Sequence, residues 1–326
     1  KMKMKMKMKM KMKMKMKMKH NFNLNYITLS TINLLLYFII CKMEHYSFGF
    51  ELELIINLNN TCSNDRIGDV VILLNKHLNE LNSNIKFDYI DYYNKDYSKW
   101  LIVTDITIRP DEYIGVPFEI ISPILNIDNM HDIFTLLFVL NKLNVYVNRT
   151  CGFHIHISKD NGFEFNEIKN IARNYILFED CIDLFHPFSR RDNTYCKSIV
   201  NNSEFVKVKS LQRKINWISH INNLEDLLYL LNPGLTDRFY KLNFKSLKKK
   251  KTIEFRQHCG TVNINDIIYW MFFVILFIYR CSLKYEEKIL QLNRKQKFLY
   301  LFDNFIKIDS IKYYYYKKNK KYKKIS

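Results

Sequence analysis

Residues 49–54 read Gly-Phe-Glu-Leu-Glu-Leu, an alternation of acidic and apolar residues that is typical of a β-strand. Successive side chains of a β-strand point to opposite faces, so Glu51 and Glu53 share one face, about 6.6 Å apart along the strand. Leu52 and Leu54 lie on the opposite face and indicate a hydrophobic core there. Two acids on a solvated strand face would explain this segment by itself, because charged side chains are usually exposed. Whether these acids are functional depends on the neighbouring strands.

Two later predicted strands, 153–158 and 252–258, repeat the pattern of polar residues at a spacing of two: His154 and His156, then Glu254, Arg256 and His258. Imidazoles two residues apart can share a metal ion or a phosphate. Taken singly, these segments could also hold half-exposed histidines or a weak ion pair within one strand. In a single sheet, however, the three strands would form one polar wall able to bind metal. A solvated face would instead carry the Lys and Asn that dominate this sequence.

Two further predicted strands add acidic residues. Residues 100–108 place Asp105 and Thr107 opposite two isoleucines, and residues 116–121 hold Glu119 in an otherwise apolar run. An unpaired buried carboxylate is very unfavourable, so Glu119 needs a partner, and a divalent cation would supply one. Carboxylates outnumber imidazoles and no thiolate cluster occurs, so the sequence predicts Mg²⁺ or Mn²⁺ rather than structural zinc.

Metal ions of this kind, held by a few carboxylates, usually bridge substrate phosphates. Arg256 and Arg238 could then neutralise a phosphoryl group during its transfer. The sequence contains no Walker A motif and no G-x-G-x-x-G motif. It therefore indicates neither a P-loop nor a Rossmann nucleotide site.

The pattern of elements predicts an α+β fold. Helices are predicted at 65–82, 128–143 with Asp128 as N-cap, 164–183, 209–231 (either continuous or broken), 265–281 and 287–308. Strands are predicted at 48–56, 100–108, 116–121, 153–158, 239–244 and 252–258. Runs of paired strands between helices predict one mainly antiparallel sheet with helices packed on one face. The apolar run Ile267–Tyr279 is short for a bilayer span and predicts a buried core helix.

The formal charge of +19 over 326 residues does not indicate a specific nucleic-acid binder. The alternating Lys-Met run at 1–19 contributes 10 lysines and residues 312–326 contribute 7, which leaves +2 for residues 20–311. Basic tails contact polyanions loosely and in a salt-dependent way. The chain has 7 glycines and 11 arginines against 40 lysines, which is typical of an AT-rich genome. An arginine or glycine retained against this bias is therefore more often required by structure or function.

The ends of the chain are predicted to lie outside the folded domain. Residues 1–42 form a low-complexity and then apolar segment, residues 43–308 form the domain, and residues 309–326 form a basic Lys/Tyr tail. The apolar stretch 21–41 is either sequence of no defined function or a membrane anchor. Seven dispersed cysteines with no C-x-x-C are typical of reduced thiols in the cytoplasm. We therefore predict a cytoplasmic protein, with anchoring through 21–41 as the alternative.

The order of the motifs resembles a known family. The motifs are G-F-E-L-E (49–53), W-x(4)-D-x-T (100–107), E-I-I-S-P (119–123), C-G-F-H-I-H (151–156), S-R-R-D-N-T-Y-C (189–196), R-F-Y-K-L-N (238–243) and T-I-E-F-R-Q-H-C-G-T (252–261). Each motif is weak by itself, but the ordered set, from about Tyr46 to Cys281, resembles the amidoligases. These belong to the carboxylate–amine ligases with a glutamine-synthetase-like fold.

The resemblance implies ATP-dependent joining of a small-molecule or peptide carboxylate to an amine through an acyl-phosphate. The implied metal ligands, for Mg²⁺ or Mn²⁺, are Glu51, Glu53, Glu119, His154 and Glu254. The implied nucleotide contacts are His156, Arg256 and Arg190, and the candidate catalytic residues are Arg256, Arg238, His156 and Asp105. Two alternatives stay open: a metal-dependent amide hydrolase that uses the same wall, and a catalytically inactive homologue that acts as a binding protein.

Overall fold

The computed structural model describes residues 45–58, 66–89, 96–111, 115–234 and 238–325. The strands are β1 (Tyr46–Ile56), β2 (Phe87–Tyr89), β3 (Trp100–Val103), β4 (Val116–Ile121), β5 (Val145–Tyr146), β6 (Gly152–Lys159), β7 (Leu242–Asn243) and β8 (Ile253–Cys259). The α-helices are α3 (Arg66–Glu80), α4 (Met130–Lys142), α5 (Phe165–Ile182), α6 (Leu211–His220), α7 (Leu224–Leu231), α8 (Ser246–Lys250), α9 (Ile264–Leu283), α10 (Arg294–Tyr300) and α11 (Asp309–Ile325). The segment 21–41 lies outside the described residues.

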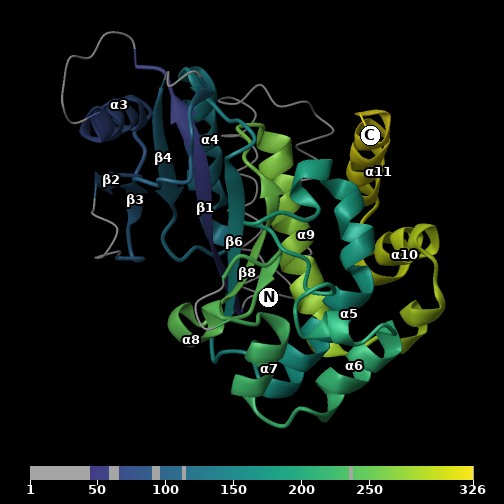
Figure 1. Ribbon diagram of the computed structural model, residues 1–326. Coiled ribbons are helices and arrows are strands. Elements are labelled where there is room, and N and C mark those ends of the chain that lie inside the picture. The colour runs from purple at the N-terminus through teal and green to yellow at the C-terminus, as the bar shows by residue number, and fades with distance from the viewer. Residues whose placement is uncertain (1–44, 59–65, 90–95, 112–114, 235–237, 326) are drawn as a thin grey trace, which may run out of the picture.

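The strands form one open sheet in the order β2-β3-β4-β1-β6-β8-β7, and β5 also pairs with β1 (Figure 1). All described pairs are antiparallel except β2 with β3. This confirms the predicted α+β class and the mainly antiparallel sheet. The edges are short, because β2 has 3 residues and β7 has 2. The long central strands β1 and β6 carry Glu51, Glu53, His154 and His156.

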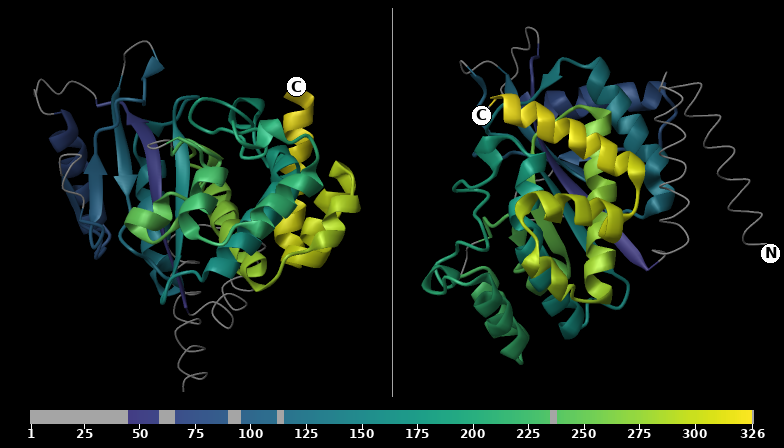
Figure 2. Two further views of the ribbon diagram at one scale, coloured as in Figure 1. Left: turned by 60° about the horizontal axis from the view of Figure 1, so that its bottom comes forward. Right: turned by 90° about the vertical axis from the view of Figure 1, so that its right-hand side faces the viewer.

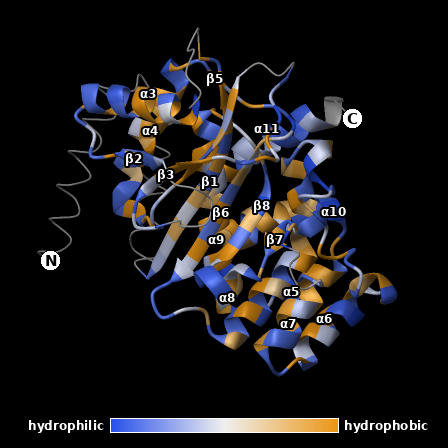
Figure 3. Cartoon of the chain, turned by 60° about the vertical axis from the view of Figure 1, so that its left-hand side comes forward, coloured by the Kyte–Doolittle hydropathy of each residue, from blue (hydrophilic) through white to orange (hydrophobic). Residues whose placement is uncertain are grey.

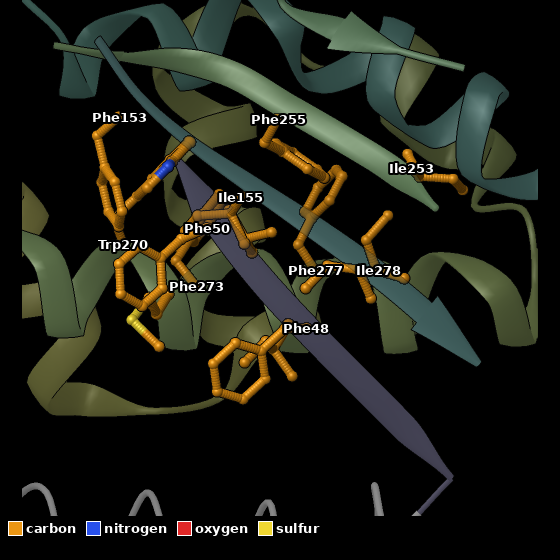
Figure 4. Packing of buried hydrophobic residues seen from close by; sticks show 14 of the residues in the cluster. Phe48, Phe50, Phe153, Ile155, Ile253, Phe255, Trp270, Phe273, Phe277 and Ile278 are labelled. Atoms are coloured by element: carbon orange, nitrogen blue, oxygen red, sulfur yellow. The ribbon is translucent and has the colours of Figure 1, made fainter. Parts of the chain in front are cut away.

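One face of the sheet is covered by helices, as predicted. Leu52 and Leu54 of β1 are fully buried in a core that also takes in apolar residues of α3, α4, α5 and α9. Figure 4 shows aromatic residues of three strands meeting α9, and Phe255 of β8 packs against Trp270 with ring centroids 6.1 Å apart. Figure 2 shows the helical layer against the sheet from two further directions. Burial of this apolar face fixes which residues lie on the other face.

Helix α9 is the buried core helix predicted from the run Ile267–Tyr279. Among the described residues it is the one helix long and apolar enough to cross a membrane, yet 72% of its most apolar window is buried inside the fold. Its burial is consistent with its all-round apolar sequence, which is typical of a central helix.

Three local predictions were wrong at the ends of elements. The strand predicted at 100–108 ends at Val103, because the side chain of Asp105 accepts hydrogen bonds from the backbone and hydroxyl of Thr107 and forms a turn. Ile106 is consequently 94% exposed. Asp128 is no N-cap, since its own backbone N–H donates to the side chain of Asn126, which caps the helical segment. The strand predicted at 239–244 is limited to β7.

Two predicted helices are interrupted. The region 209–231 divides into α6 and α7, where the side chain of Asn223 accepts a hydrogen bond from Asp226 and starts a new helix. The region 287–308 divides into a 3₁₀ turn, α10 and a π-helical turn. The basic segment after residue 308 is the helix α11, and its Ile311 and Tyr315 are buried in the main core.

A β-bulge in β8 corrects a further prediction, that His258 shares a face with Glu254 and Arg256. His156 pairs with Glu254 and Phe153 pairs with His258, so one more residue of β8 than of β6 lies between these pairs. The side chain of His258 therefore turns to the helical face, where its ring centroid lies 5.5 Å from that of Trp270. Burial lowers the pKa of His258 to about 4, so the imidazole is neutral at pH 7.

The bulge ends at a tight contact that generates a prediction. A Cβ added to Gly260 would overlap Cβ of Cys151 and approach its carbonyl carbon to 3.1 Å. We expect Gly260→Ala to lower the free energy of unfolding by about 1–3 kcal/mol, because the clash involves backbone and not a flexible side-chain end. Urea denaturation followed by circular dichroism measures this loss.

Gly49→Ala is the matched control, since the nearest atom to its added Cβ is Ser122 Oγ at 3.4 Å, an ordinary contact. Equal stability of the two variants would contradict the expected clash. It would mean that the backbone at Cys151 and Gly260 can move apart without loss of unfolding free energy.

Candidate active site

The face of the sheet opposite the helices holds a cavity of about 650 Å³. Successive side chains of β1 and β6 point in turn to this face and to the core face, so hydrophilic and hydrophobic residues follow one another along these strands (Figure 3). Glu51, Glu53, Glu119, His154, His156, Glu254 and Arg256 all lie on this side and are each no more than 9% exposed. The structure thus brings the predicted metal-binding residues together on four adjacent strands. Their functional roles stay predictions.

Glu51 lies at the centre of the group and contacts both histidines. Its two carboxylate oxygens lie 3.3 Å from Nδ1 of His154 and 3.2 Å from Nε2 of His156. A carboxylate can only accept, so Nε2 of His156 donates, and Nδ1 is left to the hydroxyl of Thr252 at 3.0 Å. Burial by itself would raise the pKa of Glu51, but the cationic Lys250 and the two histidines hold it well below its usual range.

Glu53 and Glu119 form a second acidic group. They are directly opposite each other in the β1–β4 pairing, so two like charges face across neighbouring strands. The backbone N–H of Gly152 donates to Glu53 Oε2 at 2.5 Å, and His154 Nε2 lies 3.7 Å from Glu53 Oε1. His154 therefore lies between the two acidic groups, with one ring nitrogen toward each.

Glu254 is held by an arginine and an amide. The guanidinium of Arg256, two residues along β8, donates to Glu254 Oε1, and Nδ2 of Asn243 donates to Oε2 at 2.7 Å. Burial would raise the pKa of Glu254, but Arg256 and His156 lower it to about 2. Nε of Arg256 is buried and finds no acceptor among the residues that the structure describes.

Ligand atoms from these residues lie close enough to hold metal. One atom each from Glu51, His154 and Glu254 lie within 4.8 Å of one another, and the same holds for Glu53, Glu119 and His154. Carboxylate oxygens with one imidazole are a donor set that suits Mg²⁺ or Mn²⁺. The residues present therefore fit the predicted metal, with His154 able to serve either set.

Lys250 was not singled out from the sequence, where it is one of four consecutive lysines at 248–251. They form the end of α8, and the backbone of Lys251 is left-handed at φ 58°, which stops the helix. Lys250 points back into the cavity, where Nζ donates to Glu51 Oε1 at 2.8 Å and lies 4.9 Å from the ring centroid of Tyr97. Burial would lower the pKa of Lys250, but Glu51 and Glu254 raise it above its usual range.

The other predicted site residues also line the cavity, in different settings. Arg190 is buried, and its guanidinium donates to the backbone carbonyls of Arg256 at 2.6 Å and of Gln257 at 3.4 Å, so it holds the β8 bulge. Asp105 lines the cavity from the turn after β3. Arg238 lines it from the segment before β7, 5.6 Å from the ring centroid of Phe239.

Arg109 and Arg149 also line the cavity and were not singled out from the sequence. Neither lies in a strand with alternating polar residues, so the argument from strand alternation did not select them. The scarcity of arginine in this chain was a usable signal. Five of the 11 arginines line this one cavity: Arg109, Arg149, Arg190, Arg238 and Arg256.

Comparison with known proteins places this site in a family. Residues 44–278 match the family described as "Putative amidoligase enzyme", which covers the sheet, the cavity and most of α9. No curated protein matches the chain significantly. The matched range agrees with the stretch in which the motifs resemble amidoligases and includes every residue predicted for the site. The chain therefore belongs to the amidoligase family.

Proposed function

We propose that this protein is an ATP-dependent ligase that joins a carboxylate to an amine, on a glutamine-synthetase-like catalytic domain. The observation that carries the proposal is the buried array of four glutamates and two histidines beside Arg256, next to a cavity whose lining includes five arginines. Membership of the amidoligase family supports amide bond formation as the reaction. Such an array suits a reaction in which negative charge moves between oxygens.

The acidic array provides the places for divalent metal. Glu51, His154 and Glu254 would hold one ion, and Glu53 and Glu119 would hold a second, with His154 available to either. Bound Mg²⁺ or Mn²⁺ would supply electrostatic stabilisation of the phosphates. The chain's own contribution is to fix these carboxylates, through Gly152 at Glu53 and through Asn243 and Arg256 at Glu254.

ATP would lie with its phosphates over this array. A second cavity of about 240 Å³ adjoins the first, shares Glu51, Tyr97 and Lys250 with it, and has the apolar residues Ile121 and Ile124 in its lining. The flat adenine base of ATP would suit such a pocket. His156, which lines this second cavity, and Arg256, whose Nε is free to donate, are the proposed contacts to phosphate oxygens, with Arg190 supporting Arg256 through its backbone.

The reaction then needs no covalent enzyme intermediate. A carboxylate oxygen of the acid attacks the γ-phosphorus of ATP, and the bond to the bridging oxygen breaks to release ADP. The amine nitrogen attacks the carbonyl carbon of the acyl-phosphate, inorganic phosphate leaves, and the nitrogen gives up a proton. Arg238 and Asp105, which line the cavity, are proposed to face the phosphoryl group and the substrates respectively.

Hydroxylamine trapping tests the reaction with the full chain. We expect a panel of carboxylic acids to include members that give a hydroxamate with hydroxylamine only when both ATP and Mg²⁺ are present. Amide cleavage without ATP would favour the hydrolase instead. Neither hydroxamate nor ADP production with any acid would favour an inactive binding homologue.

Arg256→Lys tests the phosphate contact. Lysine keeps the charge but lacks the planar fork of donors, so turnover should fall on the order of 100-fold, or about 2.7 kcal/mol of transition-state stabilisation. ATP affinity should weaken much less, because the contact strengthens as charge develops on the phosphoryl group. Steady-state kinetics of hydroxamate formation and an ATP-binding titration measure both quantities.

Arg213→Lys on the exposed surface of α6 is the control and should leave both quantities unchanged. Turnover of Arg256→Lys near that of the wild type would restrict Arg256 to its ion pair with Glu254.

Lys250→Met tests the metal site without an activity measurement. The ammonium group of Lys250 lies 2.8 Å from a proposed ligand oxygen of Glu51, so it repels a divalent cation and competes for that oxygen. Its removal should tighten Mn²⁺ binding about 10-fold, as measured by electron paramagnetic resonance or calorimetry. Lys249→Met removes an exposed charge at the same cavity and should leave Mn²⁺ affinity nearly unchanged. Equal or weaker Mn²⁺ binding by Lys250→Met would place the ion away from Glu51.

A further inference from the structure

Arginine is concentrated in the cavity far beyond its share of the chain. Among the residues that the structure describes, five of 11 arginines line it, against two of 28 lysines. A merely basic surface in this chain would be built from lysine, which is the abundant cation. Arginine offers a planar guanidinium that binds carboxylate or phosphate oxygens through two parallel hydrogen bonds, and lysine does not. The arginines therefore indicate that oxyanions are bound at several points of the cavity.

Three of the five have partners in the fold or belong to the proposed reaction. Arg256 pairs with Glu254, Arg190 holds the β8 bulge, and Arg238 lies over Phe239. Arg109 and Arg149 differ from these. Both are exposed at the cavity, and among the described residues neither guanidinium forms an ion pair or a side-chain hydrogen bond. These two side chains are thus available to a ligand.

The two arginines stand on different loops that are tied together. Nδ2 of Asn148 donates to the backbone carbonyl of Arg109 at 2.7 Å and to Asp111 Oδ1 at 3.2 Å. The backbone N–H of Arg109 donates to the hydroxyl of Thr150 at 3.1 Å, and that hydroxyl donates to Asn148 Oδ1 at 2.6 Å. Residues 109–111 and 148–150 are therefore joined by hydrogen bonds. These bonds keep the backbones of Arg109 and Arg149 close together at the cavity, where one ligand could reach both side chains.

This pair lies at the opposite end of the acidic array from the proposed nucleotide pocket. Arg149 is three residues before Gly152, whose backbone N–H donates to Glu53, so its loop adjoins the Glu53 end. Lys250 and the second cavity adjoin the Glu51 end. An acid substrate that enters opposite the nucleotide would extend from the array toward Arg109 and Arg149.

Resting on the proposed function, we propose that Arg109 and Arg149 form an anion subsite for a second carboxylate of the acid substrate. The substrate is then a dicarboxylate: one carboxylate lies over the array and receives the phosphoryl group, and the other is held by the two guanidiniums. A monocarboxylate leaves both guanidiniums without a partner and binds more weakly.

Calorimetry with the full chain, Mg²⁺ and ADP tests the subsite by binding alone. The probes are malonate, succinate, glutarate and adipate, each compared with its monomethyl ester, which is nearly the same size but carries one charge. We expect at least one diacid to bind about 10-fold or more tightly than its ester, in line with one charge-assisted contact. Absence of such a preference at every length would overturn the proposal.

Arg109→Gln and Arg149→Gln should each lower the affinity for that diacid about 10-fold and leave its ester, ADP affinity and melting temperature unchanged. Arg213→Gln, outside the cavity, is the matched control. Diacid affinity equal to that of the control in both variants would also overturn the subsite.

The hydroxamate assay separates the two proposals. Diacid binding that depends on Arg109 and Arg149, with no ATP-dependent hydroxamate, would keep the subsite and reject the ligase. Hydroxamate formed equally well from diacids and esters would keep the ligase and reject the subsite.

Discussion

Four glutamates concentrate negative charge on one face of a single sheet, and the groups packed around them balance that charge. Glu51, Glu53, Glu119 and Glu254 are nearly inaccessible to solvent and lie on adjacent strands. Buried carboxylates are stable as anions only with cations or hydrogen-bond donors beside them. The fold supplies these from outside the central strands, through Lys250 at the end of α8 and the amide of Asn243. Arg256 is a third such partner, and its position two residues along β8 places it beside Glu254.

The alternation of the strands made much of this site predictable. Once Leu52 and Leu54 are assigned to the core, strand geometry places Glu51 and Glu53 on the other face, and the same argument places His154 and His156. The prediction required only that the three strands share a sheet, and β1, β6 and β8 are neighbours. Regular strand geometry is therefore what allowed the side-chain orientations at these positions to be predicted.

Irregular backbone is where the prediction failed. A single extra residue in β8 turns the side chain of His258 to the opposite face of the sheet. Local sequence propensity does not predict this bulge, because Arg190 holds it from a distant segment. Asp105 lies in a run that alternates as a strand would, but its side chain accepts hydrogen bonds from Thr107 and makes a turn. Lys250 is one of four consecutive lysines, and only the end of α8 determines which one faces Glu51. Arg109 and Arg149 lie in loops, whose positions depend on the tertiary hydrogen bonds of Asn148.

The shortness of the edge strands β2 and β7 bears on how copies of the chain meet. An exposed edge presents unpaired backbone groups that can template another strand, and long flat edges are the usual starting point of aggregation. Here the two edges have 3 and 2 residues, too few for a stable intermolecular ladder. Crowded or partly unfolded molecules would therefore not readily extend one another's sheets through these edges.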